Sequence, residues 1–436
     1  MVAENQRLRD RVSRIAGDTP STPSEAKSPR IQAAAGDHLD RDDVRNPLIG
    51  DRAWFHPYHA SAPPIYLGEA ACTTFATRLR QFLTGNPDLS HAPRTQYVDE
   101  STLSAFYGSE AVWPNLAQAL LLVKITLNHV SQVYDLVPRE STLNQLEGIY
   151  QTSNFHDPML TCKFFALFAL GEAYSARAHS SSSSCRVPGT AYYVRAMTVI
   201  SIFPERSNLI HVESLLLLVS FKLLRGTYEF FFFFPPTTRL LTILQSLFSY
   251  FLNRRHSGFF LTGNALRSAL TIGLNHNIPE RQCRDPMERE HRVRIWWAIY
   301  ILDRMWSSKT GFPSEVSDDD IHVDMPSNVS AGSQFGDPEY CIAHINLARI
   351  TGQIIDQVYS RKKYLETFLH REQKLLIALK NWMQTLPGSI RLDADHSTPK
   401  HILSLHLQFN QVRRIRSFSF GGEGVRSREL TDRRSV

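Results

Sequence analysis

Residues 318–326 read DDDIHVDMP, which places Asp318, Asp320, His322 and Asp324 at alternate positions. Carboxylates gathered in this way are typical of sites for hard cations such as calcium. The stretch lacks the glycine and the distal glutamate that an EF-hand loop requires. We therefore interpret it as a solvated acidic loop that caps nearby helices, and we expect no metal there.

Two other pairs of residues have spacings used in catalysis. Tyr359 and Lys363 match the tyrosine-x-x-x-lysine spacing of some dehydrogenases, and His291 follows Glu290. The first pair lacks a glycine-rich phosphate loop, and the second is not an HExxH zinc-hydrolase pair. The sequence also has no GxSxG elbow and no P-loop. It therefore predicts a protein that is not an enzyme, with no catalytic and no cofactor-binding residue.

Two helical stretches precede the acidic loop and position it. The first, residues 265–275, is an apolar helix for which Gly273 is the expected C-terminal stop. The second begins near Glu288 and Glu290, whose negative charge suits a helix N-terminus, and over residues 292–304 it is apolar around most of its circumference, which is typical of a helix inside a large protein. Its residues at three- and four-residue steps are Val293, Trp296, Trp297, Tyr300 and Arg304.

Trp296 and Trp297 have two interpretations. They could line a small-molecule pocket, because such pockets are rich in aromatic side chains. Tryptophans at helical spacing are more often core residues, and we expect both to lie in the core.

Charges end the second apolar helix. Asp303 and Arg304 follow its apolar run, and charges at the edge of a core are tolerated only when they are paired. Arg267, on the preceding helix, is the predicted partner of Asp303. Gly311 and Pro313 then predict a turn, because glycine permits positive φ and proline fixes its own φ.

Four segments in this order and spacing resemble the regulatory, or middle homology, domain of fungal Zn2Cys6 transcription factors of the xylanolytic-activator-like type. They are ALRSALTIGLN (265–275), RVRIWWAIYILDR (292–304), GFP (311–313) and DDDIHVDMP (318–326). The positions that carry the resemblance, expected to be structural, are Arg267, Gly273, Arg294, Trp296, Trp297, Tyr300, Asp303, Arg304, Gly311, Pro313, Asp318, Asp320 and Pro326.

The resemblance implies a nuclear protein that regulates DNA-templated transcription and responds to a small-molecule effector or a partner. In this family zinc is held by an N-terminal cluster of six cysteines that reads DNA. The five cysteines of this chain are scattered, without paired spacing, so we expect no cofactor in the chain and DNA contact only through a missing or separate module. The alternative is a helical interaction fragment, dominant-negative in character, without DNA binding.

Composition is consistent with this interpretation. The 436 residues are 42% hydrophobic and 21% charged, which is enough apolar surface for a sizeable core. A net charge of +6 is compatible with a nuclear protein that associates with nucleic acid. Helical periodicity recurs along the chain without strand alternation, as in 116–133, 164–174 and 342–359. We therefore predict an all-α fold, an irregular multi-helix bundle.

The predicted organisation has four parts. Residues 1–16 have a coiled-coil seam, interpreted as the remnant of a dimerising coiled coil and so as a route to a homodimer. Residues 17–64 are rich in proline and polar residues and predict a disordered or loosely docked linker. Residues 65–411 are the helical regulatory domain, and residues 412–436 are a basic, aperiodic tail predicted to be disordered.

One segment departs from the pattern. Residues 230–236 read FFFFFPP, and we interpret 225–245 as a non-native insert in the helical domain. A genuine buried insertion and a membrane hairpin are the alternatives. Charges interrupt the apolar stretch at Glu213, Lys222, Arg225, Glu229 and Arg239, so it lacks the uncharged run of roughly 18–20 residues that a spanning helix needs. We expect no membrane association.

Overall fold

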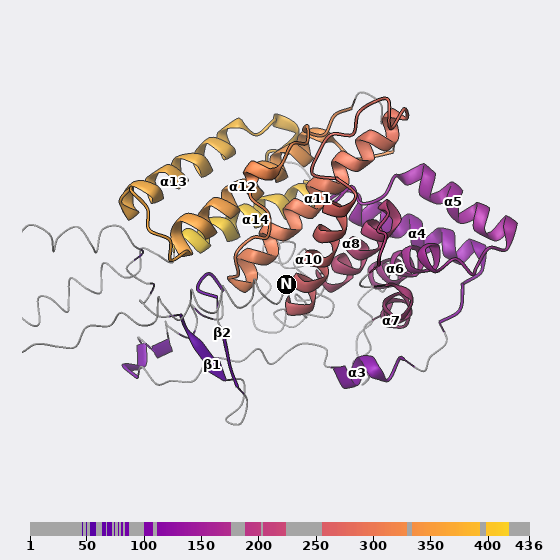
Figure 1. The fold of residues 1–436 in the computed structure, drawn as a ribbon, viewed down its shortest axis with the longest axis horizontal. Helices are drawn as coiled ribbons and strands as arrows, with labels where there is room; N and C mark the ends of the chain where they lie inside the picture. The colour runs from indigo at the N-terminus through magenta and orange to yellow at the C-terminus, as the bar shows by residue number, and fades with distance from the viewer. Residues whose placement is uncertain are drawn as a thin grey trace, which may run out of the picture. The chain divides into compact units, whose positions relative to one another are not determined.

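Helices form nearly all of the regular structure, as Figure 1 shows. The computed structural model describes residues 100–107, 111–175, 188–201, 204–223, 255–328, 334–392 and 398–417, together with separate positions between 46 and 86. All of these residues belong to one unit, residues 42–436. The predicted all-α fold is confirmed for this part of the chain.

A two-stranded antiparallel ribbon precedes the helices. The ring of Tyr66 lies 5.8 Å from that of Phe55 on the paired strand and stacks at 6.1 Å on Phe312, which follows a central helix. Some of the segment 17–64, predicted as a linker, is therefore ordered against the helical domain. The strands are β1 (Phe55–Pro57) and β2 (Pro64–Tyr66).

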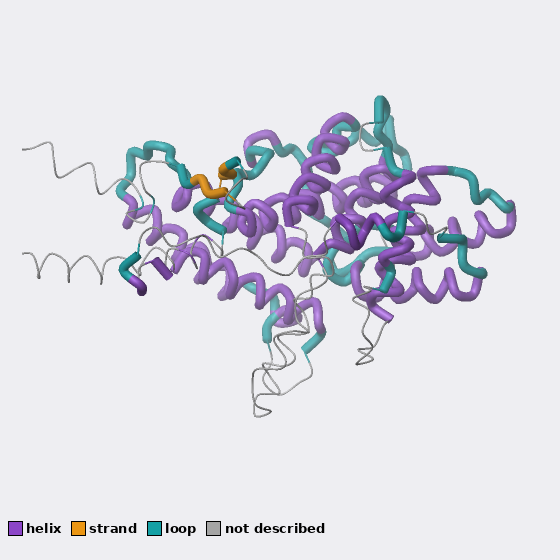
Figure 2. The backbone as a smooth tube through the Cα atoms, turned by 90° about the horizontal axis from the view of Figure 1, so that it is seen from below, coloured by secondary structure: helices purple, strands orange, loops and turns teal. Residues whose placement is uncertain are grey.

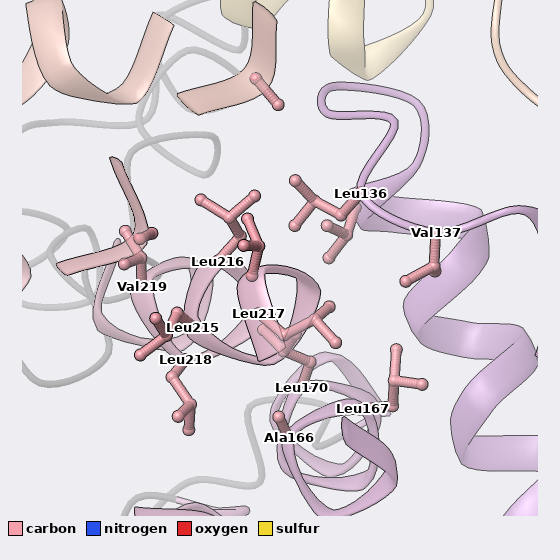
Figure 3. Close-up of a cluster of buried hydrophobic side chains, with 14 of the residues drawn as sticks. Leu136, Val137, Ala166, Leu167, Leu170, Leu215, Leu216, Leu217, Leu218 and Val219 are labelled. Carbon is pink, nitrogen blue, oxygen red and sulfur yellow. The ribbon is translucent and has the colours of Figure 1, made fainter. Parts of the chain in front are cut away.

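The N-terminal helices enclose the larger of two hydrophobic cores. Every residue of α6 from Thr161 to Gly171 is buried, and α6 packs against α4, α7 and α8. Figure 3 shows leucines of α6 and α8 meeting Leu136 and Val137 in this core. The helices are α3 (Glu100–Ser104), α4 (Leu116–Val130), α5 (Arg139–Thr152), α6 (Pro158–Ser175), α7 (Thr190–Val199) and α8 (Leu209–Leu223).

The central helices are α10 (Arg255–Thr271) and α11 (Pro286–Thr310). Gly273 ends α10 as expected: its φ is +68°, and its N–H donates to the carbonyl oxygen of Leu270 at 3.0 Å. Asp285 caps α11 by accepting a hydrogen bond from the backbone N–H of Met287, so the helix begins close to Glu288 as expected, and it continues past Arg304 to Thr310. It packs against α8, α10 and α12.

The C-terminal helices form a second, separate hydrophobic core. Trp382 is central to it, because its indole N–H donates to the carbonyl oxygen of Ala343 at 2.8 Å and its ring stacks on Phe409 at 5.1 Å. Figure 2 shows the described helices of the protein, in purple, from a second direction. The C-terminal helices are α12 (Pro338–Tyr359), α13 (Phe368–Thr385) and α14 (Lys400–Ser417), with short 3₁₀ turns η2 (Asp318–Asp320) and η3 (Gly388–Ile390).

Helix α14 corrects one predicted boundary. The domain was expected to end at residue 411 and a disordered tail to begin at 412, but the helix continues to Ser417. Val412 is buried in the second core, and this contact carries the helix past the predicted end. The coiled coil of 1–16, the insert of 225–245 and the tail beyond Ser417 lie outside the described residues. Among the described helices, none has the length and apolar character needed to cross a membrane.

Candidate functional site

The residues that carry the sequence motif gather along one stripe of α11 and the chain that follows it. We call residues 311–328 the return segment, because it runs back along α11: its first residues contact the end of the helix and its last residues contact the beginning. Asp318 contacts Arg304, and Ser327 contacts Arg294. The α11 side chains that hold this segment recur at three- and four-residue steps and are Glu290, Arg294, Trp297, Tyr300 and Arg304.

Arg304 holds the beginning of the return segment. Its guanidinium donates to the carbonyl oxygen of Val316 at 2.7 Å and to the carboxylate of Asp318 at 2.8 Å. The hydroxyl of Tyr300 donates to the same Asp318 oxygen at 2.8 Å, and the guanidinium lies 4.4 Å from the centre of the Tyr300 ring. A Cβ at Gly352 of α12 would lie 2.8 Å from Arg304 Nε, so glycine leaves room for this side chain. Asp318 is thus an anchor of the segment.

The predicted pairing of Asp303 with Arg267 is wrong. Asp303 pairs with its neighbour Arg304 at 2.5 Å and accepts a hydrogen bond from the backbone N–H of Glu315 at 3.4 Å. Arg267 reaches the solvent side of the segment, where it pairs with the Glu315 carboxylate at 3.0 Å and keeps 65% of its side chain exposed. Burial raises the pKa of Asp303 to about 6, although Arg304 opposes that shift.

Trp297 holds the middle of the return segment. Its indole N–H donates to the carbonyl oxygen of Asp324 at 2.8 Å, and its ring meets Tyr300 edge-on at 5.4 Å and Arg349 of α12 at 5.2 Å. Trp296 is 1% exposed and Trp297 is fully buried. The expectation that both tryptophans are core residues is confirmed.

Arg294 holds the end of the return segment inside a buried charge network. Its side chain is fully buried, pairs with Asp135 at 2.5 Å and Glu290 at 2.7 Å, and donates to the carbonyl oxygens of Gly336 and Ser327. Burial lowers the pKa of Arg294, but the two carboxylates outweigh that effect and raise it. Glu290 also accepts from the backbone N–H of Ser327 at 3.0 Å.

The sequence interpretation missed Glu290 and Asp135 as partners of Arg294. Glu290 was detectable, because it precedes Arg294 by one helical turn and glutamate and arginine at that spacing pair on a helix face. Asp135 lies in the connection between α4 and α5, and no local spacing relates it to α11.

The connection between α10 and α11 holds the other side of the return segment. His276 and His322 form an isolated parallel bridge, and their rings stack at 5.2 Å. Asn275 accepts from the backbone N–H of His322 at 2.9 Å, and its side-chain amide donates to the carbonyl oxygen of Asp320 at 3.2 Å. The Asp320 carboxylate itself is exposed. Backbone hydrogen bonds therefore hold the acidic stretch on this side.

The turn residues of the motif begin and end the segment. Gly311 ends α11 with φ +74°, and a Cβ there would meet the backbone of Gly68, so the position excludes a side chain twice over. Pro313 is exposed and its carbonyl oxygen accepts from Ser307 at 3.4 Å, whereas Pro326 is buried. The described residues contain no group of three or more His, Cys, Asp or Glu that could hold a metal ion.

A cavity of about 330 Å³ lies beside the stripe, where the α10–α11 connection, the first turns of α11 and the return segment meet. Neither Trp296 nor Trp297 lines it. The sequence did not indicate this cavity, because its walls come from three segments that only the fold brings together.

A family model described as "Fungal specific transcription factor domain" matches residues 123–384, more than half of the chain. The chain is 25% identical to Activator of stress genes 1 of Saccharomyces cerevisiae, over 70% of the chain and 31% of that protein. It is 23% identical to an uncharacterized transcriptional regulatory protein of Schizosaccharomyces pombe, over 80% of the chain and 42% of the relative.

A shorter match, 27% identical over 32% of the chain, is to a negative regulator of pleiotropic drug resistance of Candida glabrata. The chain spans less than half the length of these relatives. No solved structure matches the chain.

Proposed function

Because the chain belongs to the fungal-specific transcription factor domain family, we propose that it is the regulatory domain of a fungal transcription regulator. The observation that carries the proposal is the extent of the family match, which runs from α4 into α13 and includes α11 with its return segment. The matched relatives are themselves named as activators or regulators. The side chains of Arg294, Trp297, Tyr300 and Arg304 are engaged in hydrogen bonds within the protein, which supports a regulatory rather than a catalytic role.

DNA contact belongs to a separate module under this proposal. The five cysteines of the chain offer no paired spacing for a zinc cluster, so zinc and base recognition would be supplied by a module on another segment or another chain. The protein would act in the nucleus, as a monomer or homodimer, and would pass an effector signal to that module.

A reporter assay in yeast tests this function. We would fuse the full chain to a bacterial DNA-binding domain and measure transcription from a promoter that carries the bacterial operator. We expect expression to change severalfold relative to the DNA-binding domain alone, upward for an activator and downward for a repressor. Unchanged expression at matched protein levels, with the fusion in the nucleus, would contradict the proposal. An Arg294→Met fusion is the matched variant, and we expect it to lose the effect because the return segment is released.

A further inference from the structure

The cavity beside α11 is partly open to solvent, and its volume is that of a small-molecule site. Its volume of about 330 Å³ falls at the lower end of the range found for ligand pockets, so it suits a molecule smaller than most cofactors. Its apolar lining comes from all three segments and includes Leu274, Ile278, Val293, Val323 and Met325. Leu274 is buried, and the others are half-buried.

Most of the charges around the cavity are already paired. Arg289 pairs with Glu280 at 3.3 Å and also donates to the carbonyl oxygens of Cys283 and Arg284. Glu290 accepts from Arg294 and from Ser327. These groups have their partners within the protein, so they do not call for a charged ligand.

Two lining charges have capacity left over. Arg292 donates from Nη2 to the carbonyl oxygen of Ile272 at 2.8 Å, whereas its Nε has no acceptor. A guanidinium carries five N–H donors, so the terminal nitrogens of Arg292 have N–H groups left for a further acceptor, whereas the buried Nε is out of a ligand's reach. Across the cavity, Asp324 uses its backbone N–H and carbonyl oxygen for Asn277 and Trp297. Its exposed carboxylate has no ion pair or hydrogen bond among the described residues.

From this arrangement we infer that the cavity binds a free amino acid with an apolar side chain. Its carboxylate faces the Arg292 guanidinium, its ammonium group faces the Asp324 carboxylate, and its side chain covers the apolar lining. A ligand with only one charge leaves either Arg292 or Asp324 without a partner. A ligand without an apolar part leaves the apolar lining in contact with water.

A ligand bound in the cavity would contact the return segment. Arg292 lies on α11, Asp324 lies on the return segment, and Ile278 lies on the connection that pairs with it. One ligand therefore bridges the elements that the motif residues hold together. The regulatory meaning of this binding rests on the proposed function, whereas the binding itself is a property of the chain alone.

Calorimetry with the purified full chain tests the inference. The probes are leucine and phenylalanine, and their controls are leucinamide, which lacks the carboxylate, and N-acetyl-leucine, which lacks the ammonium group. We expect saturable binding of the free amino acids and affinities about tenfold or more lower for both analogues, because a charge-assisted hydrogen bond contributes roughly 1.5–3 kcal/mol. The variants Arg292→Gln and Asp324→Asn should each lower the affinity for leucine to a similar extent. Arg281→Gln, an exposed arginine of the same connection outside the cavity, should not.

Three outcomes would overturn the inference: no saturable binding of either amino acid, equal binding of the analogues, or variants that bind as the natural chain does. Asp324→Asn changes an exposed side chain, so it keeps the test decisive even where Arg292→Gln fails to fold. Absent binding together with an active reporter fusion would reject this site and leave the proposed function standing. Binding together with an inactive reporter fusion would do the reverse.

Discussion

Helices α6 and α11 are both buried along most of their length, yet they are held in different ways. Helix α6 presents an almost continuous apolar surface, with Phe164, Phe165 and Phe168 fully or almost fully buried, and Lys163 adds a buried ion pair with Glu213 of α8 at 2.7 Å. Helix α11 buries its tryptophans equally well but also buries Arg294 and Arg304. Apolar burial is non-directional, so it stabilises α6 without selecting which neighbouring atom lies where. The directed hydrogen bonds of α11 fix the return segment residue by residue.

The largest expected effect is that of Arg294→Met. The substitution leaves the buried carboxylates of Asp135 and Glu290 without their cation, and breaking a buried pair in this way costs about 3–5 kcal/mol. Chemical denaturation of the purified chain measures the change. A loss below about 1 kcal/mol would show that water or another cation replaces the guanidinium.

Leu170→Ala in α6 is the matched apolar variant. Leu170 is fully buried between α6 and α8, as Figure 3 shows, and its truncation leaves a cavity that costs about 3 kcal/mol. We expect the return segment to stay in place, because no hydrogen bond to it is lost. Release of that segment in this variant would mean that general stability, and not the α11 stripe, holds it.

Asp303→Asn should change how stability depends on pH. The folded-state pKa of Asp303 is about 6, above its ordinary value of 3.8, so the folded state takes up a proton first as the pH falls from 7 to 4. The natural chain therefore gains stability from this group over that window, on the order of 1–3 kcal/mol, and the variant does not. Melting curves of both chains at several pH values measure the difference. Asp319→Asn, at an exposed neighbour, is the control, and parallel curves for Asp303→Asn would contradict the prediction.

Tyr300→Phe should have a smaller effect. It removes the hydroxyl that donates to Asp318 at 2.8 Å and leaves the ring in its contacts with Trp297 and Arg304. A single hydrogen bond contributes about 1.5–3 kcal/mol when its acceptor is charged, and the partial exposure of Asp318 puts this one at the lower end of that range. Denaturation of the single variants and of the double variant with Asp318→Asn would measure the coupling, and strictly additive losses would show that the two groups do not interact.

Arg267→Gln should have the smallest effect. Its pair with Glu315 is largely exposed, and exposed pairs contribute about 0–1 kcal/mol. A loss of several kcal/mol in the free energy of unfolding would contradict this prediction and favour a buried pair between Arg267 and Asp303. Repeating the measurement at high salt is the check, because an exposed pair weakens as salt screens it.

The sequence predicted the helices with strong apolar periodicity and missed those without it. Helix α11 was evident from its aromatic and aliphatic residues, and the acidic residues near Glu288 indicated where it begins. Helix α5 was not predicted, because it buries only Thr142, Leu146 and Ile149, a stripe too narrow to stand out. Helix α14 continues beyond residue 411 because Val412 packs into the second hydrophobic core. The helices of that core are distant in sequence, so local periodicity did not indicate this contact.

The sequence identified the motif residues and predicted which of them are buried, but it did not predict their partners. Spacing along one helix predicted that Trp296 and Trp297 lie in the core, because periodicity reports which side of a helix is buried. Partnership across the chain has no such signal. Arg294 and Asp135 are 159 residues apart and meet only through tertiary packing. The same packing places Arg267 beside Glu315 and not beside Asp303. The walls of the cavity come from three segments that only the fold brings together, so the sequence could not predict it either.

Hydrogen exchange of the return segment is the most direct test of the difference between the two helices. The amides of His322 and Ser327 are bonded to Asn275 and Glu290, and we expect both to be protected in the natural chain. In Arg294→Met these amides should exchange much faster, while in Leu170→Ala they should keep the protection of the natural chain under native conditions. Equal acceleration in both variants would contradict the claim that the polar stripe of α11 fixes the return segment.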